Sequence, residues 1–169
     1  NVWLRGKESL TAVGINNEQA QFSDGLWPIV LSVASEAYHL VRGREAETES
    51  NEQEPIRTWY QQWLDQEPVP KNILAHLKQT YRVANGLAAP DQGWALGESW
   101  QQLYSVLVQR ISHGGLAEDD WPNFRRVASE MEKIAFGPPA ENVGRMIALV
   151  ESGFVDLSLA QSGFPPADS

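Results

Sequence analysis

The sequence of 169 residues contains no cysteine. Disulfide bonds, zinc sites built on thiolate ligands and cysteine nucleophiles are therefore excluded for this chain. A cysteine-free composition is compatible with a reducing compartment, and we expect a cytoplasmic location.

Long apolar runs are also missing. The longest apolar stretch, residues 26–41, is interrupted by Glu36 and His39. It is shorter than the ~20 apolar residues that cross a bilayer as a helix. The sequence therefore predicts no association with the membrane interior.

Basic residues are in the minority: 13 Lys and Arg stand against 22 Asp and Glu, giving a net charge of -9. This charge disfavours nonspecific binding to nucleic acid or to anionic lipid, because both require basic patches. The acidity is concentrated in residues 44–55, which hold five Glu and one Arg. We interpret this stretch as a solvated acidic loop, with an acidic docking segment as the alternative.

The motifs of common catalytic and cofactor sites are absent as well. The sequence has no P-loop and no Gly-x-Gly-x-x-Gly fingerprint, and its nearest approach to a nucleophile elbow, residues 97–101, lacks the second glycine. The three histidines, His39, His76 and His113, fall in separate segments without zinc-ligand spacing. Residues 118–120 are three adjacent acids, which we interpret as charge compensation in the first turn of a helix. We expect no catalytic, cofactor-binding or metal-binding residue in this chain, and no enzymatic activity of the chain alone.

Helical periodicity is what the sequence does contain. Apolar residues recur at steps of three and four, and this spacing predicts an all-α, compact bundle of about six helices forming a single domain over residues 1–169. Ser23 and Asp24 are predicted to cap the first helix, and Pro70 is predicted to lie in the first turn of the third. The Trp-Pro pairs at 27–28 and 121–122 are predicted to mark the starts of helices. Two short end pieces, residues 2–4 and 154–159, are predicted to be extended. The predicted helices span residues 26–41, 56–65, 70–85, 96–111, 118–136 and 138–152, and Gly43 and Gly86 are predicted to end the first and the third of them.

Seven tryptophans are many for this length, and some of them suggest a surface for a partner. Trp59 with Trp63 and Trp94 with Trp100 are the candidate pairs. Arg126 and Lys133 lie seven residues apart and can share a helix face that meets an anion. The candidate interaction residues are thus Trp59, Trp63, Trp94, Arg126 and Lys133, and the further basic residues of the same part of the sequence are Arg110, Arg125 and Arg145.

One segment, residues 121–157, carries a family resemblance. It contains Phe136-Gly-Pro-Pro-Ala-Glu-Asn142 and then Gly153-Phe-Val-Asp156. This order resembles the helical region of a bacterial family of FAD/NAD(P)-binding oxidoreductases, in which a Phe-Gly-Pro-Pro-x-Glu-Asn stretch precedes a helix that ends near Gly-x-Val-Asp. The glycine-rich FAD fingerprint of that family is absent here, so no cofactor residue is carried over.

The resemblance implies that the chain is a fragment of a larger protein, namely a helical, substrate-side or capping portion of a flavin-dependent oxidoreductase. FAD and NAD(P) would then bind to the parent protein, and the remainder of that polypeptide would be the partner of this chain. The alternative is a stand-alone helical module for protein–protein interaction. Self-association through residues 154–159 is a further expectation, because an unpaired strand there can pair with a second copy.

Overall fold

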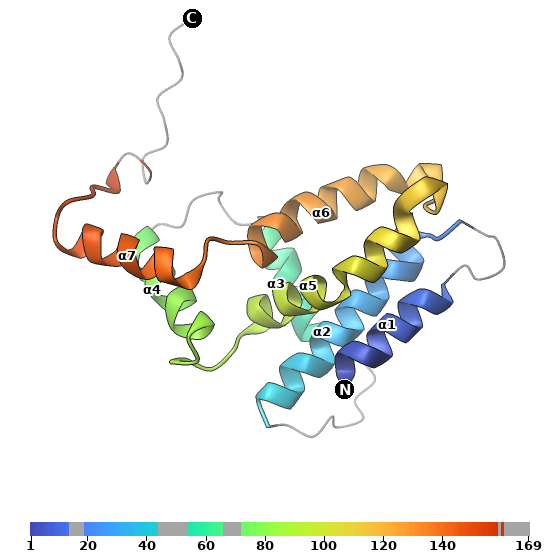
Figure 1. Ribbon diagram of the computed structural model, residues 1–169, viewed down its shortest axis with the longest axis horizontal. Coiled ribbons are helices and arrows are strands. Elements are labelled where there is room, and N and C mark those ends of the chain that lie inside the picture. The colour runs from blue at the N-terminus through green and yellow to red at the C-terminus, as the bar shows by residue number, and fades with distance from the viewer. Residues whose placement is uncertain (14–18, 44–53, 66–71, 159, 161–169) are drawn as a thin grey trace, which may run out of the picture. The chain divides into compact units, whose positions relative to one another are not determined.

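The computed structural model describes residues 1–13, 19–43, 54–65, 72–158 and 160. In these ranges the chain is mainly α-helical, as the sequence predicts, and has no strand beyond one isolated bridge between Ala20 and Leu116. Short π-helical and 3-10 turns, η1 (Phe22–Leu26), η2 (Ser112–Gly114) and η3 (Glu118–Asp120), connect some of the helices (Figure 1). The α-helices are α1 (Val2–Ala12), α2 (Trp27–Val41), α3 (Glu54–Asp65), α4 (Ile73–Ala84), α5 (Gln92–Ile111), α6 (Trp121–Ala135) and α7 (Ala140–Glu151).

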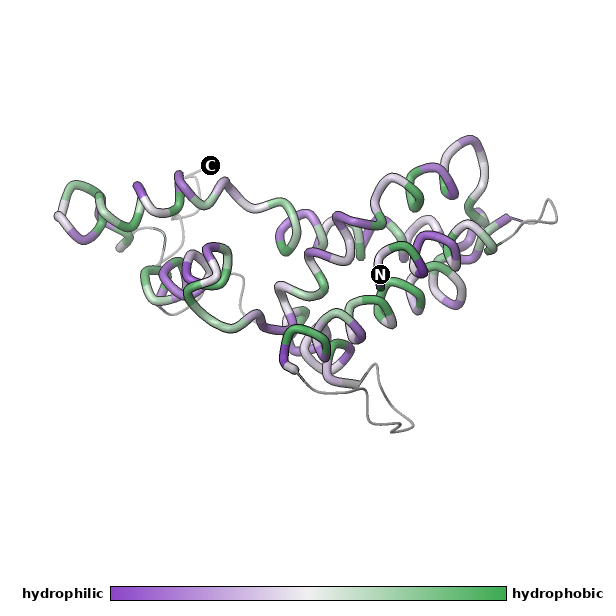
Figure 2. Tube along the Cα trace, turned by 60° about the horizontal axis from the view of Figure 1, so that its bottom comes forward, coloured by the Kyte–Doolittle hydropathy of each residue, from purple (hydrophilic) through white to green (hydrophobic). Residues whose placement is uncertain are grey.

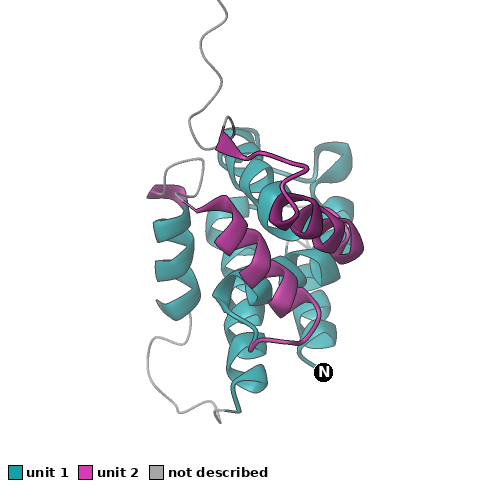
Figure 3. Ribbon diagram, turned by 90° about the vertical axis from the view of Figure 1, so that its left-hand side faces the viewer, with its two compact units in different colours: residues 1–63, 90–137 teal, residues 64–89, 138–169 magenta. Residues whose placement is uncertain are grey.

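The chain divides into two compact units, shown in separate colours in Figure 3. Unit 1 comprises Asn1–Trp63 and Pro90–Gly137, and unit 2 comprises Leu64–Ala89 and Pro138–Ser169. Each unit is therefore discontinuous in sequence. Folding of the two as one domain stays a prediction.

The core of unit 1 is built on α2 and α5, whose buried residues recur at helical spacing as the sequence predicts. Leu40 and Val41, which the same spacing places at the end of the α2 stripe, are instead exposed. On α5, Leu96, Leu103 and Leu107 are buried, at the steps of four and seven that place side chains on one helix face. On α2, the buried residues include Val30, Val33, Ala34 and Ala37. In Figure 2 apolar (green) and polar (purple) stretches alternate along the helical parts of the chain, as expected for amphipathic helices.

Helix α1 was not predicted, and the expectation of an extended piece at residues 2–4 is wrong. Asn1 caps this helix, since its Oδ1 accepts a hydrogen bond from the backbone N–H of Trp3 at 3.0 Å. The buried stripe is Val2, Gly6 and Leu10, spaced by four. Because the central residue of this stripe is a glycine, large apolar residues do not recur at regular helical spacing in the sequence. The same glycine allows close packing, because a Cβ at Gly6 would lie 2.6 Å from Val33 Cγ2 and 3.1 Å from Leu103 Cδ2.

The entry into α2 also differs from the prediction. Ser23 and Asp24 do not cap the helix; they lie within η1, whose chain turns directly into α2. Pro28 lies in the first turn, as expected, but Trp27 before it has α-helical dihedrals instead of extended ones. Trp121, which precedes Pro122 at the start of α6, also has α-helical dihedrals. In both places the turn before the helix continues into the helix without a break. The usual preference of a residue before proline for an extended backbone is therefore overridden.

Unit 2 contains a helix pair, α4 and α7. Tyr81 packs against Gly144, where a Cβ would lie 2.9 Å from Tyr81 Cε2, so the glycine allows the two helices to approach closely. An ion pair between Lys78 Nζ and Glu151 Oε1 at 2.6 Å links the same helices. Both groups are about half exposed, so this pair contributes little to stability.

The predicted extended piece at residues 154–159 is also wrong over its described part. Gly153 has φ +77, and the backbone N–H groups of Phe154 and Val155 donate to the carbonyl of Leu149. These residues therefore close the C-terminus of α7, as a glycine-based helix cap does. Asp156 then accepts bonds from the backbone N–H and the hydroxyl of Ser158. Self-association through this stretch stays a prediction, without the strand that motivated it.

Some predictions fall outside the described residues, namely those for Pro70 and for most of the acidic stretch 44–55. The predicted glycine stops of α2 and α4 are confirmed, since Gly43 and Gly86 both have positive φ. Within the described ranges, no helix combines the length and apolar content that crossing a membrane requires.

Candidate functional site

The most extensive feature of unit 1 is a row of contacting aromatic rings. Trp27 lies at its centre: its ring centroid is 5.2 Å from that of Tyr60 and 6.2 Å from that of Trp100. Contacts of this kind stabilise beyond the burial of apolar area by about 0.5–1.5 kcal/mol each. The row joins η1, α2, α3, α5 and α6. In order of contact its rings are Trp121, Phe124, Phe22, Trp27, Trp100, Tyr104 and Phe136, with Tyr60 beside Trp27.

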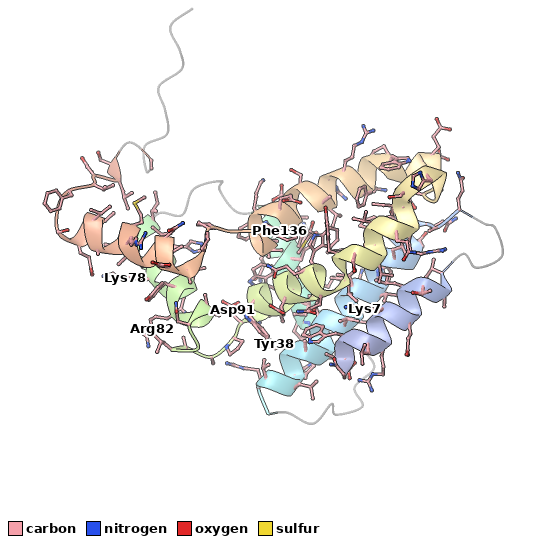
Figure 4. The ribbon with its side chains drawn as sticks, viewed as in Figure 1. Lys7, Tyr38, Lys78, Arg82, Asp91 and Phe136 are labelled. Atoms are coloured by element: carbon pink, nitrogen blue, oxygen red, sulfur yellow. The ribbon has the colours of Figure 1, made fainter. Side chains whose placement is uncertain are left out.

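This row reaches the surface at Tyr104 and Phe136. Their side chains are 42% and 44% exposed, and their rings meet edge to face at 5.6 Å. Val108, one helical turn beyond Tyr104 on α5, is 37% exposed. Figure 4 labels Phe136 where the chain leaves α6. We call Tyr104, Val108 and Phe136 the aromatic end; it is an apolar surface that the sequence analysis did not identify.

Trp59 and Trp63, a predicted interaction pair, are brought together on α3. Their rings stack at 5.8 Å with an interplanar angle of 23°. The ring of Trp59 lies against Gly93 of α5, where a Cβ would be 2.7 Å from Trp59 Cζ2. Both side chains are half-buried. They attach α3 to the bundle and present only part of their surface outward.

Trp63 is tied to α6 through a carboxylate. Its indole N–H donates to Glu130 Oε2 at 3.1 Å, and Glu130 Oε1 pairs with Lys133 Nζ at 2.8 Å. The Lys133 ammonium lowers the pKa of Glu130, and the Trp63 bond adds to this effect against the opposing effect of burial. Lys133 is thus already paired within its own helix, which weakens its candidacy as an anion-binding residue.

Tyr60 and Arg126 lie in the same region. Burial raises the pKa of Tyr60 to about 12, with a further increase from Glu130 and an opposing effect from Arg126. The hydroxyl therefore stays protonated at neutral pH, and Tyr60 is not a base. Arg126 is exposed on α6. Of the predicted residues, Trp59, Trp63, Arg126 and Lys133 thus gather along α3 and α6.

Trp94 and Trp100 do not form the predicted surface pair. Trp100 is 1% exposed and belongs to the aromatic row, so the prediction for this residue is wrong. Trp100 falls on the apolar stripe of α5. Spacing alone does not tell whether an aromatic residue on such a stripe lies in the core or at the surface. Trp94 is half-buried in the first turn of α5, where Asp91 Oδ1 accepts from its backbone N–H at 2.8 Å.

The further basic residues named from the sequence each contact another group. The Arg110 guanidinium donates to the carbonyl of Val13 at the end of α1, a structural contact. Arg125 lies over the ring of Trp121 at 5.9 Å. Arg145 pairs with Glu141 one turn away, within unit 2. Each of these three cations therefore already has a partner in the fold.

Ser99, the serine in the nearest approach to a nucleophile elbow, has a structural partner. Ser99 is fully buried, and its hydroxyl donates to the carbonyl of Ala95 at 2.7 Å. His113 follows α5 with φ +56, a left-handed conformation. Among the described residues, no three His, Asp or Glu side chains are placed so that they could hold a metal ion.

Asp120 has a larger role than the predicted charge compensation. Its Oδ2 accepts from the backbone N–H of Phe22 at 2.6 Å, and its Oδ1 accepts from the hydroxyl of Ser23 at 2.6 Å. Burial alone would raise the pKa of Asp120, but these bonds outweigh it and the pKa is lowered. Nearby, Ala20 pairs with Gly115 and Ala117 through backbone bonds. Asp120 therefore fastens η1 to the start of α6.

We expect Asp120→Asn to lower the free energy of unfolding by about 1–2 kcal/mol at neutral pH, as losing a charge-assisted cap does. Because the folded-state pKa of Asp120 lies below its unfolded value, this contribution is present above about pH 4 and is lost as pH falls further. Urea unfolding of both proteins at about pH 7 and about pH 3 measures it. An equal difference at both pH values would show that the carboxylate charge is not responsible.

Comparison with protein-family models, with curated proteins and with solved structures gives no match for this chain. The family resemblance of residues 121–157 therefore remains an expectation based on their sequence.

Proposed function

We propose that this chain is the helical, non-catalytic portion of a flavin-dependent oxidoreductase and covers the substrate side of a flavin held by other parts of the polypeptide. FAD and NAD(P) are cofactors of that parent protein in this proposal. The remainder of the polypeptide, with its dinucleotide-binding domains, is the partner. A cytoplasmic location in a bacterial cell belongs to the same proposal.

One observation carries most of the support. Phe136, the first residue of the Phe-Gly-Pro-Pro stretch, is at the surface end of the aromatic row and is 44% exposed. Phe136 and Tyr104 expose two contacting aromatic rings side by side, and an exposed apolar cluster is more informative than a single exposed side chain. Exposed aromatic rings backed by a rigid core can line a site for an organic substrate.

The order of elements after Phe136 gives further support. A helix, α7 (Ala140–Glu151), follows the two prolines and closes at Gly153, which precedes Val155 and Asp156. This is the succession of features that the resemblance implies. The glycine-rich turn that holds a pyrophosphate at a helix N-terminus has no counterpart in the sequence.

The alternative function, a stand-alone helical interaction module, has its own observation in its favour. The stacked pair of Trp59 and Trp63 is only half-buried, and tryptophan is enriched at protein interfaces. Under this alternative the same chain binds a separate protein and has no connection with flavin.

Titration of the purified chain tests the part of the proposal that concerns cofactors. We expect neither FAD nor NADPH to bind measurably, because the strand, glycine turn and helix N-terminus that hold a pyrophosphate are missing. Flavin fluorescence and calorimetry are the measurements. Micromolar binding of FAD, or a yellow preparation of the chain alone, would overturn the assignment of the flavin site to other parts of the polypeptide.

A further inference from the structure

The C-terminus of α4 carries an Asn-Gly pair, Asn85-Gly86, whose chemistry the proposed function does not use. Both residues are exposed, and nothing lies within 4 Å of where a Cβ of Gly86 would be. We propose that Asn85 is a deamidation site that is closed while the last turn of α4 is formed and reacts when this turn opens. This inference is independent of the proposed function.

The reaction needs only this dipeptide and water. The backbone nitrogen of Gly86 attacks Cγ of Asn85, an N–Cγ bond forms, and the Cγ–Nδ2 bond breaks. Nδ2 leaves as ammonia and carries away the proton of the Gly86 N–H. Water then adds to one of the two carbonyl carbons of the cyclic imide, the bond from that carbon to the nitrogen breaks, and the nitrogen takes up a proton of the water, giving aspartate or isoaspartate at position 85. A glycine in second place favours the attack because no side chain obstructs its nitrogen.

Both reacting groups are held in the folded helix. The Asn85 side-chain N–H donates to the carbonyl of Tyr81 at 2.8 Å, which directs the amide back along α4. The attacking nitrogen of Gly86 donates its N–H to the carbonyl of Val83 at 3.0 Å. Attack on Cγ requires both bonds to break, so the reaction proceeds from the opened turn.

The surroundings of this turn indicate that it opens locally. Val83 is the single buried residue of α4 among those described, and residues 84–87 that follow it are all exposed. The bonds that close the helix beyond it are backbone bonds from Leu87 and Ala88 to the carbonyl of Arg82, in an exposed segment. Exposed helix ends with few buried contacts are the first parts of a protein to open.

The product changes the helix end. A carboxylate at position 85 places negative charge beside the negative end of the α4 dipole, and it no longer donates to the carbonyl of Tyr81. Isoaspartate also lengthens the backbone where the cap is formed. Each conversion therefore makes reclosing of the turn less favourable, and the change is irreversible because ammonia is lost.

The test is the rate of conversion at Asn85, measured by peptide mass mapping during incubation at neutral pH. We expect conversion to be about tenfold or more slower in the native chain than in the chain unfolded in urea, because two hydrogen bonds hold the turn closed. Equal rates in the two conditions would contradict the gating. Absence of conversion even in urea would contradict the site itself.

Ala84→Gly provides a gating variant that leaves both reacting residues in place. Ala84 is exposed, and glycine weakens the last turn of the helix, so native-state conversion should become about fivefold faster while the rate in urea stays unchanged. Gly86→Ala is the chemical control and should slow conversion in both conditions. An Ala84→Gly chain that converts at the native wild-type rate would overturn the proposal that opening of this turn controls the reaction.

Discussion

Leu107→Ala should lower the free energy of unfolding by about 2–5 kcal/mol, a large part of the ~5–15 kcal/mol of a typical domain. Leu107 lies in the buried stripe of α5 and is 1% exposed. Its removal loses the transfer free energy of the side chain and leaves a cavity between helices that can close only in part. Denaturant unfolding, followed by circular dichroism, measures the change.

The matched control is Leu40→Ala. Leu40 lies near the end of α2 and is 63% exposed, so its substitution should change stability by less than about 0.5 kcal/mol. If Leu107→Ala had as small an effect as this control, the alignment of α5 in the core would be wrong.

Gly6→Val should cost about 1–3 kcal/mol, even though valine has a higher helix propensity than glycine. The space at Gly6 is already closed by Val33 of α2 and Leu103 of α5, with a built Cβ 2.6 Å from the nearer side chain. A β-branched side chain there forces α1 away from its neighbours. Thermal and denaturant unfolding report the loss.

Two comparisons isolate the cause of this loss. Ser9→Val, at an exposed position of the same helix, should be nearly neutral. Combining Gly6→Val with Val33→Ala should cost less than the sum of the two single changes, because the smaller side chain makes room. Strict additivity would mean that the two side chains do not meet, and that α1 crosses elsewhere.

Much of the fold follows from helical periodicity alone. Six of the helices in the described part of the chain lie where steps of three and four in apolar residues predict them, and Gly43 and Gly86 end helices as expected. Periodicity succeeds in these segments because large apolar side chains fill the buried positions. It fails for α1, where the central buried position is Gly6 and contributes no apolar signal. Asn1, three residues ahead of Leu4, is the capping signal that could have identified this helix.

The ends of elements were harder to predict than their centres. Alternation of apolar residues after Gly153 favours a strand, but the same glycine closes α7, and the next two residues donate to its last turn. Likewise, Ser23 and Asp24 have the right chemistry for a cap, yet Ser23 is bound by Asp120, which lies 97 residues away. Such long-range partners cannot be read from local patterns.

The candidate site shows the same limit. Sequence spacing identified Trp59 and Trp63 as a pair and placed Arg126 and Lys133 on one helix, but it could not reveal that Glu130 joins Trp63 to Lys133. It also missed the aromatic end. Tyr104 recurs with the apolar residues of α5 at helical spacing, and Phe136 is the last residue of the predicted helix 118–136, so neither is marked locally as a surface residue. Only the fold brings these two rings together.

The flavin content of the complete natural gene product tests the central proposal most directly. The product should be purified without added cofactor, and its visible spectrum and released flavin should be compared with those of this chain alone. We expect bound FAD in the complete product and none in the chain, because the proposal assigns the flavin site to other parts of the polypeptide. A complete product that contains no flavin, and takes up none when FAD is supplied, would contradict the account and favour the stand-alone interaction module.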